Sequence, residues 1–340
     1  VALVHYPIEN IKGEIIKTSL TNLDIQDIAR TCQTYGIKKY FITHPVKEQR
    51  ELAKNVLDYW ENEVESLKND PDALNEFYRQ FPRSENHAFR DESKNSIFNL
   101  QKIYEQIDYN DTTGVESLVM KGDFHWEGGK RGTNVIWTPS RKGKFYISWL
   151  PPKEMKNNVR RENNLFYPGN EHVGSFGCDS YDISGVVGGS GSKGALHGLT
   201  KVTMDNAPSE LFFLEYVARP QTAELFYEDV LMACHFYGMP ILIENNKPRI
   251  LYYFKSRGYR NFALNRPDKL KNELSKSEKE LGGIPSSSSV ISVHAEAIEA
   301  YIERNVGVEQ SGVYKDIGAM GSMYFMRTLL DWSNYNIHNR

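Results

Sequence analysis

An ordered series of apolar segments between residues 173 and 264 constrains this 340-residue chain more than any other feature. Three apolar runs with strand character are followed by a helix whose apolar residues recur at helical spacing, and then by a fourth run. Gly238 terminates the helix, and a second helix is expected over 248–258. The order predicts an α/β fold with a mixed sheet flanked by helices. We expect strands over 173–178, 195–204, 211–217 and 240–244, with the first helix over 222–237.

Acidic residues stand at the ends of two of these strands. Asp179 follows the first strand, with Asp182 close behind it, and Glu244 ends the fourth. Carboxylates at the carboxyl ends of neighbouring strands converge on one sheet edge, where they can bind Mg²⁺ or Mn²⁺. Two such ions can activate water for phosphodiester cleavage, and Asp182 would assist from further out or through a second ion. Alternatively, all three are ordinary solvated acids. The order of strands, helix and acids is that of a ribonuclease H-like nuclease.

A basic run follows the second acid. Residues 247–271 contain eight basic side chains and a single acid, Asp268, although the whole chain has a formal charge of −3. Basic side chains beside an acidic metal site would hold a phosphate backbone in register. The alternative is a solvated helix face whose aromatic residues pack in the core. We predict DNA contacts from Lys247, Arg249, Lys255, Arg257 and Arg260.

The rest of the chain divides by composition into three segments. Residues 1–62 are neutral and have the pattern of a βαβα unit. Residues 63–114 carry a net charge of −5 and are expected to form a helical connector interrupted by two prolines. Residues 115–170 are β-rich, with alternating aromatic and polar residues and glycine turns. We expect these segments to precede a ribonuclease H-like nuclease domain over 171–340.

Cysteine usage and hydropathy exclude several classes of protein. The three cysteines, Cys32, Cys178 and Cys234, are isolated, so neither a disulfide scaffold nor a standard zinc site is expected. No run of about 18 apolar residues is present, so we expect no membrane span. The run from Gly188 to Gly194 lacks the Ser or Thr of a phosphate-binding loop and is expected to form a turn. The reducing cytoplasm, that of a host cell for a viral protein, is the expected location.

Four stretches make residues 65–340 resemble the large terminase subunit of tailed bacteriophages, in particular the crAss-like group. They are FYRQFPRSENHAFRDES (77–93), FGCDSYDISG (176–185), the segment from ARPQTAELFYEDV to NFALNRP (218–267), and MYFMRTLLDWSNYNIHNR (323–340). Members of this family package DNA and join an ATPase motor to a ribonuclease H-like nuclease. The resemblance implies that Asp179 and Glu244 are the first two metal-ligand acids. It also implies double-stranded DNA, the portal and the small terminase subunit as partners, and no membrane.

Two parts of the family pattern have no counterpart here. The ATPase motor expected before residue 65 is missing, in agreement with the lack of a Walker A sequence. The third nuclease acid normally follows a segment like NYNIHNR, where this chain ends at Arg340. Asp316 and Asp331 are available carboxylates, but neither matches by position. We therefore expect a DNA endonuclease dependent on Mg²⁺ or Mn²⁺ that is weakened or inactive without its third acid.

The start of the chain resembles a different family. Residues 5–45, HYPIENIKGEIIKTSLTNLDIQDIARTCQTYGIKKYFITHP, are similar to the N-terminus of a SPOUT-class RNA methyltransferase, which binds S-adenosylmethionine. Gln26 stands where that family usually has His, and its cofactor-binding C-terminal half has no counterpart. We interpret the chain as a fusion or chimera joined near residues 60–66. The alternatives to an endonuclease are S-adenosylmethionine-dependent RNA methylation and a non-catalytic module that binds DNA or the portal.

Overall fold

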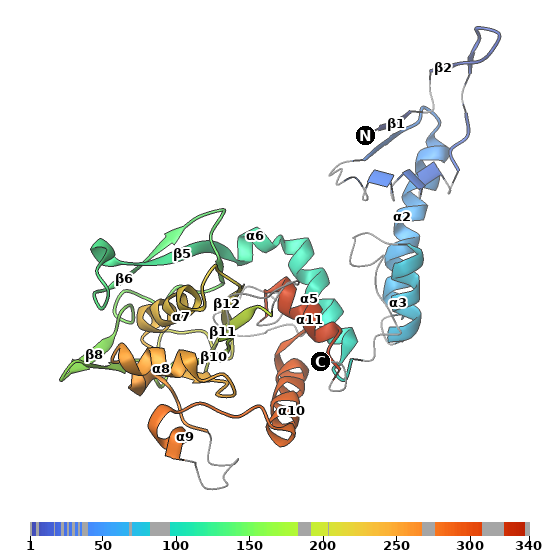
Figure 1. Cartoon of the computed structure of the whole chain (residues 1–340). Coiled ribbons are helices and arrows are strands. Elements are labelled where there is room, and N and C mark those ends of the chain that lie inside the picture. Colours follow the sequence, from blue (N-terminus) through green and yellow to red (C-terminus); the bar gives the residue numbers. More distant parts are fainter. Residues whose placement is uncertain are drawn as a thin grey trace. The chain divides into compact units, whose positions relative to one another are not determined.

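The computed structural model forms two compact units, one of residues 1–95 with 336–340 and one of residues 96–335, each with its own core (Figure 1). None of the described helices is both long enough and apolar enough to cross a membrane. The three cysteines, all within the described residues, are buried and free. The structure describes residues 2–4, 7–16, 18–21, 24–25, 27–28, 31–32, 35, 40–67, 70–81, 96–182, 192–202, 204–266, 276–307 and 323–336.

The first unit contains a parallel strand pair, a hairpin and two long helices. β1 pairs in parallel with β4, as the predicted βαβα order requires, and β2 pairs antiparallel with β3. A helical stretch begins after Thr21, whose hydroxyl accepts a hydrogen bond from the Asp24 N–H at 3.2 Å. The elements are β1 (Ala2–Val4), β2 (Ile8–Glu9), β3 (Ile15–Ile16), β4 (Phe41–Thr43), α2 (Lys47–Leu67) and α3 (Pro71–Gln80).

One of the prolines expected to interrupt the connector begins a helix instead. Pro71 occupies the first position of α3, where no N–H donor is needed. The Asp70 carboxylate caps this helix by accepting a hydrogen bond from the Ala73 N–H at 3.1 Å. Leu74 and Phe77 then pack against α2. The second proline, with the rest of residues 82–95, lies outside the described residues.

The second unit is built on a seven-stranded mixed sheet with the order β13-β10-β11-β12-β7-β5-β6. All neighbours are antiparallel except β10 and β13, which are parallel. This confirms the predicted α/β class, whereas the ribonuclease H-like identity stays a prediction. The strands are β5 (Met120–Trp126), β6 (Val135–Pro139), β7 (Phe145–Ile147), β10 (Gly174–Asp179), β11 (Gly194–Thr200), β12 (Phe212–Ala218) and β13 (Ile241–Ile243), with a separate hairpin of β8 (Val159–Glu162) and β9 (Leu165–Pro168).

Three strands of the β-rich segment over 115–170 belong to this same sheet. β7 pairs with β12, so β5, β6 and β7 extend the sheet formed by the later strands. The ring of Phe145 stacks on that of Tyr216 with 4.2 Å between centroids, which joins the two regions in one core. The segment is thus part of the domain that follows it.

Helices cover both faces of the sheet (Figure 1). α7 and α8 pack side by side on one face, and α5, α10 and α11 on the other. Thr222 caps α7, and Gly238 at a φ of 60° ends it, as predicted. After α8 the chain forms a 3₁₀ turn over Arg260–Phe262, followed by a single bridge from Ala263 to Ile241. The helices are α5 (Leu100–Thr113), α6 (Val115–Leu118), α7 (Ala223–Tyr237), α8 (Arg249–Ser256), α9 (Lys276–Leu281), α10 (Ser288–Asn305) and α11 (Met326–Ser333), with 3₁₀ turns over Glu127–Gly129 and Arg260–Phe262.

Candidate functional site

The two acids predicted as metal ligands lie at one edge of the sheet. β10 and β13 run in parallel with Cys178 opposite Ile243, and the Glu244 N–H donates to the Cys178 carbonyl oxygen at 2.9 Å. One step further in this register sets Asp179 beside Glu244, on chains about 5 Å apart. Cys178 and Ile243 are buried, so strand alternation directs both acids to the opposite face. The edge therefore offers two adjacent carboxylates, of which Asp179 is exposed and Glu244 half-buried.

Burial and a nearby cation act in opposite directions on an acid at this edge. Burial raises the pKa of Asp179, and the Lys247 ammonium opposes that rise. Burial also raises the pKa of the Cys178 thiol well above its usual value, and the charges of Asp179 and Glu244 add to the rise. A thiol held in this way stays protonated, so Cys178 packs as a small apolar residue and is no nucleophile.

Asp182, the acid predicted to assist the two metal ligands, follows β10 and is contacted from α7 and α8. The Tyr227 hydroxyl donates to the Tyr181 carbonyl oxygen at 2.6 Å and lies 3.5 Å from a carboxylate oxygen of Asp182. Arg249 donates to the Asp182 backbone carbonyl oxygen at 2.9 Å. Among the described residues, no three His, Cys, Asp or Glu side chains are grouped as metal ligands. The described part of the edge therefore holds an acid pair.

Of the two carboxylates considered for the third ligand position, the structure describes only Asp331. Asp331 lies on α11, 3.9 Å from Arg327, where burial raises its pKa and Glu215 adds to the rise. Asp316 lies outside the described residues, as does most of the predicted glycine turn over 188–194.

Three of the five predicted DNA-contacting residues are exposed along α8. Lys247 lies in the loop before this helix. The Arg249 guanidinium is 2.8 Å from Glu224, and Lys255 pairs with Glu280. The side chains of Arg249 and Lys255 remain 52% and 43% exposed, so these are weak surface pairs. All three cations are accessible to an anionic partner.

The other two, Arg257 and Arg260, have structural partners. Arg257 is only 18% exposed and lies 2.6 Å from Glu228 of α7. Arg260 donates to the backbone carbonyl oxygens of Glu280 at 2.6 Å and Ala263 at 2.7 Å. These contacts tie the chain after α8 to its neighbouring segments, so both arginines contribute to the fold.

Sequence reasoning misses the buried carboxylate of Glu228 in α7. It accepts hydrogen bonds from Trp126 Nε1 at 2.6 Å and from the Tyr253 hydroxyl, besides that from Arg257. Burial by itself would raise the pKa of Glu228, but the bonds from Tyr253, Trp126 and Arg257 together hold it below its usual value. Glu228 is therefore a charged centre that joins α7 to β5 and α8.

Its neighbour Asp229 is buried in a second polar cluster. Lys144 Nζ lies 2.7 Å from one Asp229 carboxylate oxygen, and the Tyr216 hydroxyl donates to the same oxygen at 2.6 Å. Burial nevertheless raises the pKa of Asp229. Two adjacent acids in the middle of a mostly apolar helix are the sequence signal for these clusters, since such acids need buried partners.

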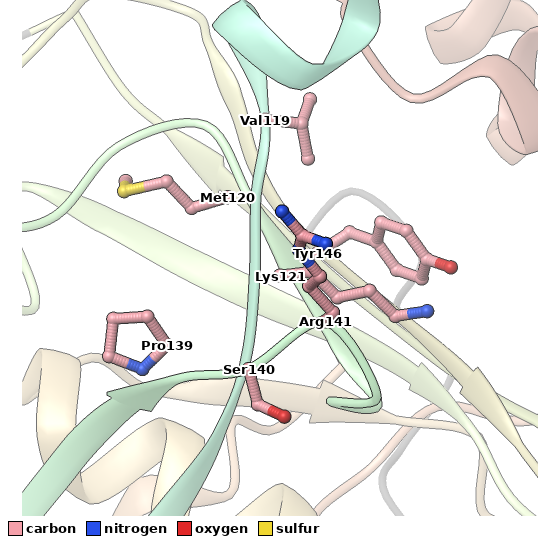
Figure 2. Close-up of a pocket in the computed structure, with 7 residues that line it drawn as sticks. All are labelled: Val119, Met120, Lys121, Pro139, Ser140, Arg141 and Tyr146. Atoms are coloured by element: carbon pink, nitrogen blue, oxygen red, sulfur yellow. The ribbon is translucent and has the colours of Figure 1, made fainter.

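A cavity of about 800 Å³ lies at the opposite end of the sheet, where β5, β7 and the turn after β6 meet. Figure 2 shows Lys121 and Arg141 beside the ring of Tyr146, and Lys121 Nζ is 4.9 Å from the ring centroid. The sheet order separates this cavity from the acid edge on β10 and β13. Its lining residues are Val119, Met120, Lys121, Pro139, Ser140, Arg141 and Tyr146.

In the first unit, His44 is a buried structural imidazole. Its Nε2 is 2.9 Å from the Thr18 carbonyl oxygen, and its Nδ1 accepts a hydrogen bond from the Val46 N–H at 3.1 Å. The neutral tautomer with hydrogen on Nε2 satisfies both contacts, so His44 fixes the turn after β4. Gln26, singled out above, lies outside the described residues.

Comparison with known proteins assigns a relationship to the start of the chain. A family described as SAM-dependent RNA methyltransferase matches residues 1–77. A tRNA (guanine-N(1)-)-methyltransferase of Oleidesulfovibrio alaskensis is 48% identical over 59 residues, which are 17% of this chain and 14% of that protein. Its counterpart from Nitratidesulfovibrio vulgaris is 46% identical over 59 residues, with the same shares. An uncharacterized protein of Aquifex aeolicus is 43% identical over 63 residues, 18% of this chain and 31% of that protein.

The predicted similarity of the chain's start to RNA methyltransferases is thus confirmed at family level. The matches span less than a third of each of these relatives. The family match ends at residue 77, before the second unit begins at residue 96.

Proposed function

We propose that the chain combines two functions, and that its second unit is a metal-dependent DNA endonuclease related to the nuclease of a packaging terminase. The observation that carries this proposal is the parallel pairing of Cys178 with Ile243, because Asp179 and Glu244 directly follow these two residues at the carboxyl ends of their strands. Carboxylate oxygens are the ligands that Mg²⁺ and Mn²⁺ prefer. The exposed cations along α8 supply the attraction for a phosphate backbone.

The acidic and basic residues at the edge would have different roles, the acids toward the metal ion and the cation toward a phosphate. Asp179 and Glu244 would hold the ion, which when bound supplies the positive charge that activates water and stabilises the leaving oxygen. Lys247, close to Asp179, would bind a phosphate oxygen next to the scissile bond. Arg249 donates to the backbone carbonyl oxygen of Asp182 and so fixes the position of this residue.

Plasmid nicking tests this function. The full chain should nick supercoiled DNA with Mn²⁺ or Mg²⁺, and Asp179→Ala and Glu244→Ala should each lower the rate at least about a hundredfold. Glu154→Ala, at an exposed acid in the same unit, is the matched control and should nick normally. Unchanged nicking by both edge variants would reject the site. Salt-sensitive DNA binding without cleavage at any metal concentration would favour the non-catalytic module instead.

For the first unit we propose a role in S-adenosylmethionine-dependent RNA methylation. The family match over residues 1–77 supports this role, whereas the proposal for the second unit is supported by its geometry alone. Parallel strands are normally covered on both faces, yet Phe41 of β4 is 58% exposed. A complete methyltransferase site would therefore need further protein against this strand.

Calorimetry and methyl transfer test the second role. S-adenosylmethionine titrated into the full chain should give a saturable heat that S-adenosylhomocysteine competes away, and labelled methyl groups should appear in bulk tRNA. Absence of both signals at high protein concentration would exclude RNA methylation by this chain.

A further inference from the structure

A polar pocket of about 500 Å³ lies where the β8–β9 hairpin meets the C-terminal end of α8. Four cationic side chains from separate segments line it: Arg131 after β5, Arg161 of β8, Lys255 of α8 and Arg257 just beyond α8. The basic run at 247–271 contributes only two of these four. The others come from the β-rich segment, so the pocket exists only in the folded unit.

The walls of this pocket are held rigidly by the backbone. The Phe166 N–H of β9 donates to the Gly258 carbonyl oxygen at 2.8 Å, and the Phe166 ring stacks on Tyr259 with 4.3 Å between centroids. Gly258 has a φ of 82°, and a Cβ there would lie 2.5 Å from the Asn164 carbonyl oxygen. Glycine thus permits the hairpin turn to approach the end of α8 closely.

The pocket has an excess of positive charge. Arg131 and Arg257 share Glu228, at 3.3 Å and 2.6 Å, and Lys255 pairs with Glu280. Four cations therefore face two carboxylates in ion-pair contact among the described residues, which leaves two positive charges uncompensated. The Arg131 and Lys255 side chains are 65% and 43% exposed, so the charge is open to solvent.

Arg161 carries the most clearly uncompensated positive charge in this pocket. Its guanidinium donates to Asn164 Oδ1 at 2.9 Å and lies 5.2 Å from the centroid of the Phe166 ring. Both partners are neutral, and in the described part of the chain Arg161 has no ion pair. Stacking orients the guanidinium, whose remaining donors match the oxygens of a phosphate.

We propose that this pocket binds a phosphate group of the DNA backbone, at a distance from the acid edge set by α8. The identification of this phosphate as part of DNA rests on the proposed endonuclease function. Lys247, near Asp179, precedes α8, and Lys255 lies at its other end. The six helical steps from Arg249 to Lys255, at about 1.5 Å each, span about 9 Å, and Lys247 lies two residues before Arg249. A DNA strand lying along α8 would therefore contact cations at both ends of this helix, one beside the acids and one at the pocket.

Binding of DNA without metal tests this assignment. Anisotropy of a short labelled duplex is measured in EDTA between about 50 and 200 mM salt with the full chain. Arg161→Gln and Lys255→Gln should each weaken binding about tenfold and lower the salt slope by about one. The matched control is Arg160→Gln, the adjacent residue of β8, which pairs with Glu162 at 2.9 Å and lies over Tyr167; it should bind normally.

The outcomes separate the pocket from the endonuclease proposal. Wild-type affinity and slope in both pocket variants would overturn the backbone assignment. Calorimetry with pyrophosphate tests the other source: heat that Arg161→Gln loses, together with normal DNA binding, would assign the pocket to a free phosphate compound. Asp179→Ala should lose nicking without any weakening of metal-free DNA binding, so the loss of nicking there leaves the pocket result untouched. Thermal unfolding of each variant verifies the fold.

Discussion

Two groups of carboxylates in the second unit occupy opposite environments. Asp179 and Glu244 stand at strand ends on the sheet edge, and Asp179 is exposed. Glu228 and Asp229 are buried in α7, where each accepts hydrogen bonds from at least two donors of neighbouring elements. Buried carboxylates need such partners, because an unpaired buried charge is strongly unfavourable.

The difference separates acids that stabilise the fold from acids available for chemistry. For Glu228, hydrogen bonds outweigh burial and lower the pKa. For Asp179, an exposed residue, partial burial of the carboxylate by neighbouring atoms outweighs the nearby Lys247 charge and raises the pKa. A carboxylate kept in such a setting contributes little to stability and is a candidate for a ligand role. Four substitutions or conditions test this comparison.

The largest effect is expected from Glu228→Ala. It removes the partner of Arg257 and leaves Trp126 Nε1 without its acceptor, which should lower the free energy of unfolding by about 3 kcal/mol. Urea unfolding followed by tryptophan fluorescence measures this, since four of the five tryptophans belong to the second unit. Glu154→Ala is the exposed control. A loss no larger than in that control would place Glu228 with the surface acids.

An effect of similar size is expected from the pH dependence of His235, also in α7. Burial lowers the pKa of His235 to about 4, and its Nδ1 is 2.7 Å from the Tyr259 hydroxyl. The unfolded chain, with a pKa near 6.5, binds the proton first, so this contribution is complete above about pH 6.5 and is lost as the pH falls toward 4. The loss amounts to about 3 kcal/mol.

His235→Gln supplies the control for this pH dependence. The variant is less stable at neutral pH, but its unfolding free energy should vary less between pH 6.5 and 4 than that of the wild type. The difference between the two curves isolates His235 from the carboxyls that titrate in the same range. Parallel curves would contradict the assignment.

The strands and helix over 173–244 could be predicted because each carries a local signal. Apolar runs of strand length, helical spacing in α7 and the glycine at position 238 are properties of neighbouring residues. The pairing of β7 with β12 has no such signal. It depends on contacts such as that of Phe145 with Tyr216, 71 positions apart by their numbers, and it places the β-rich segment within the later domain.

The candidate site shows the same limit. The register of Asp179 and Glu244 follows from two acids at the ends of strands that are neighbours in the sheet. The partners of Arg257 and Arg260 do not follow from a basic run, because Glu228 and the backbone oxygens that hold them come from distant segments. Arg161 could be found only by folding the hairpin against α8.

Asp179→Asn should change the free energy of unfolding by a small amount and, unlike Glu228→Ala, should raise it. With a pKa raised in the folded state, Asp179 favours folding below its unfolded pKa near 3.9 and loses that contribution as the pH rises. In EDTA the variant should therefore be more stable than the wild type at pH 7, by at most about 0.5 kcal/mol, and equal to it near pH 3. Added Mg²⁺ should raise the melting temperature of the wild type alone. If the variant were less stable than the wild type at pH 7, Asp179 would contribute to folding as the buried acids of α7 do, and the comparison would fail.

The smallest effect on stability is expected from Glu224→Gln, one helical turn before Glu228. Its pair with Arg249 is exposed on both sides, at 59% and 52%, so the unfolding free energy should change by less than about 0.5 kcal/mol. The substitution also removes a negative charge beside Arg249, so duplex DNA should bind more tightly and with a steeper salt dependence. Two acids on one face of one helix would then differ severalfold in their contribution to folding, because only Glu228 is removed from water. Equal losses at both positions would show that burial is not what distinguishes them.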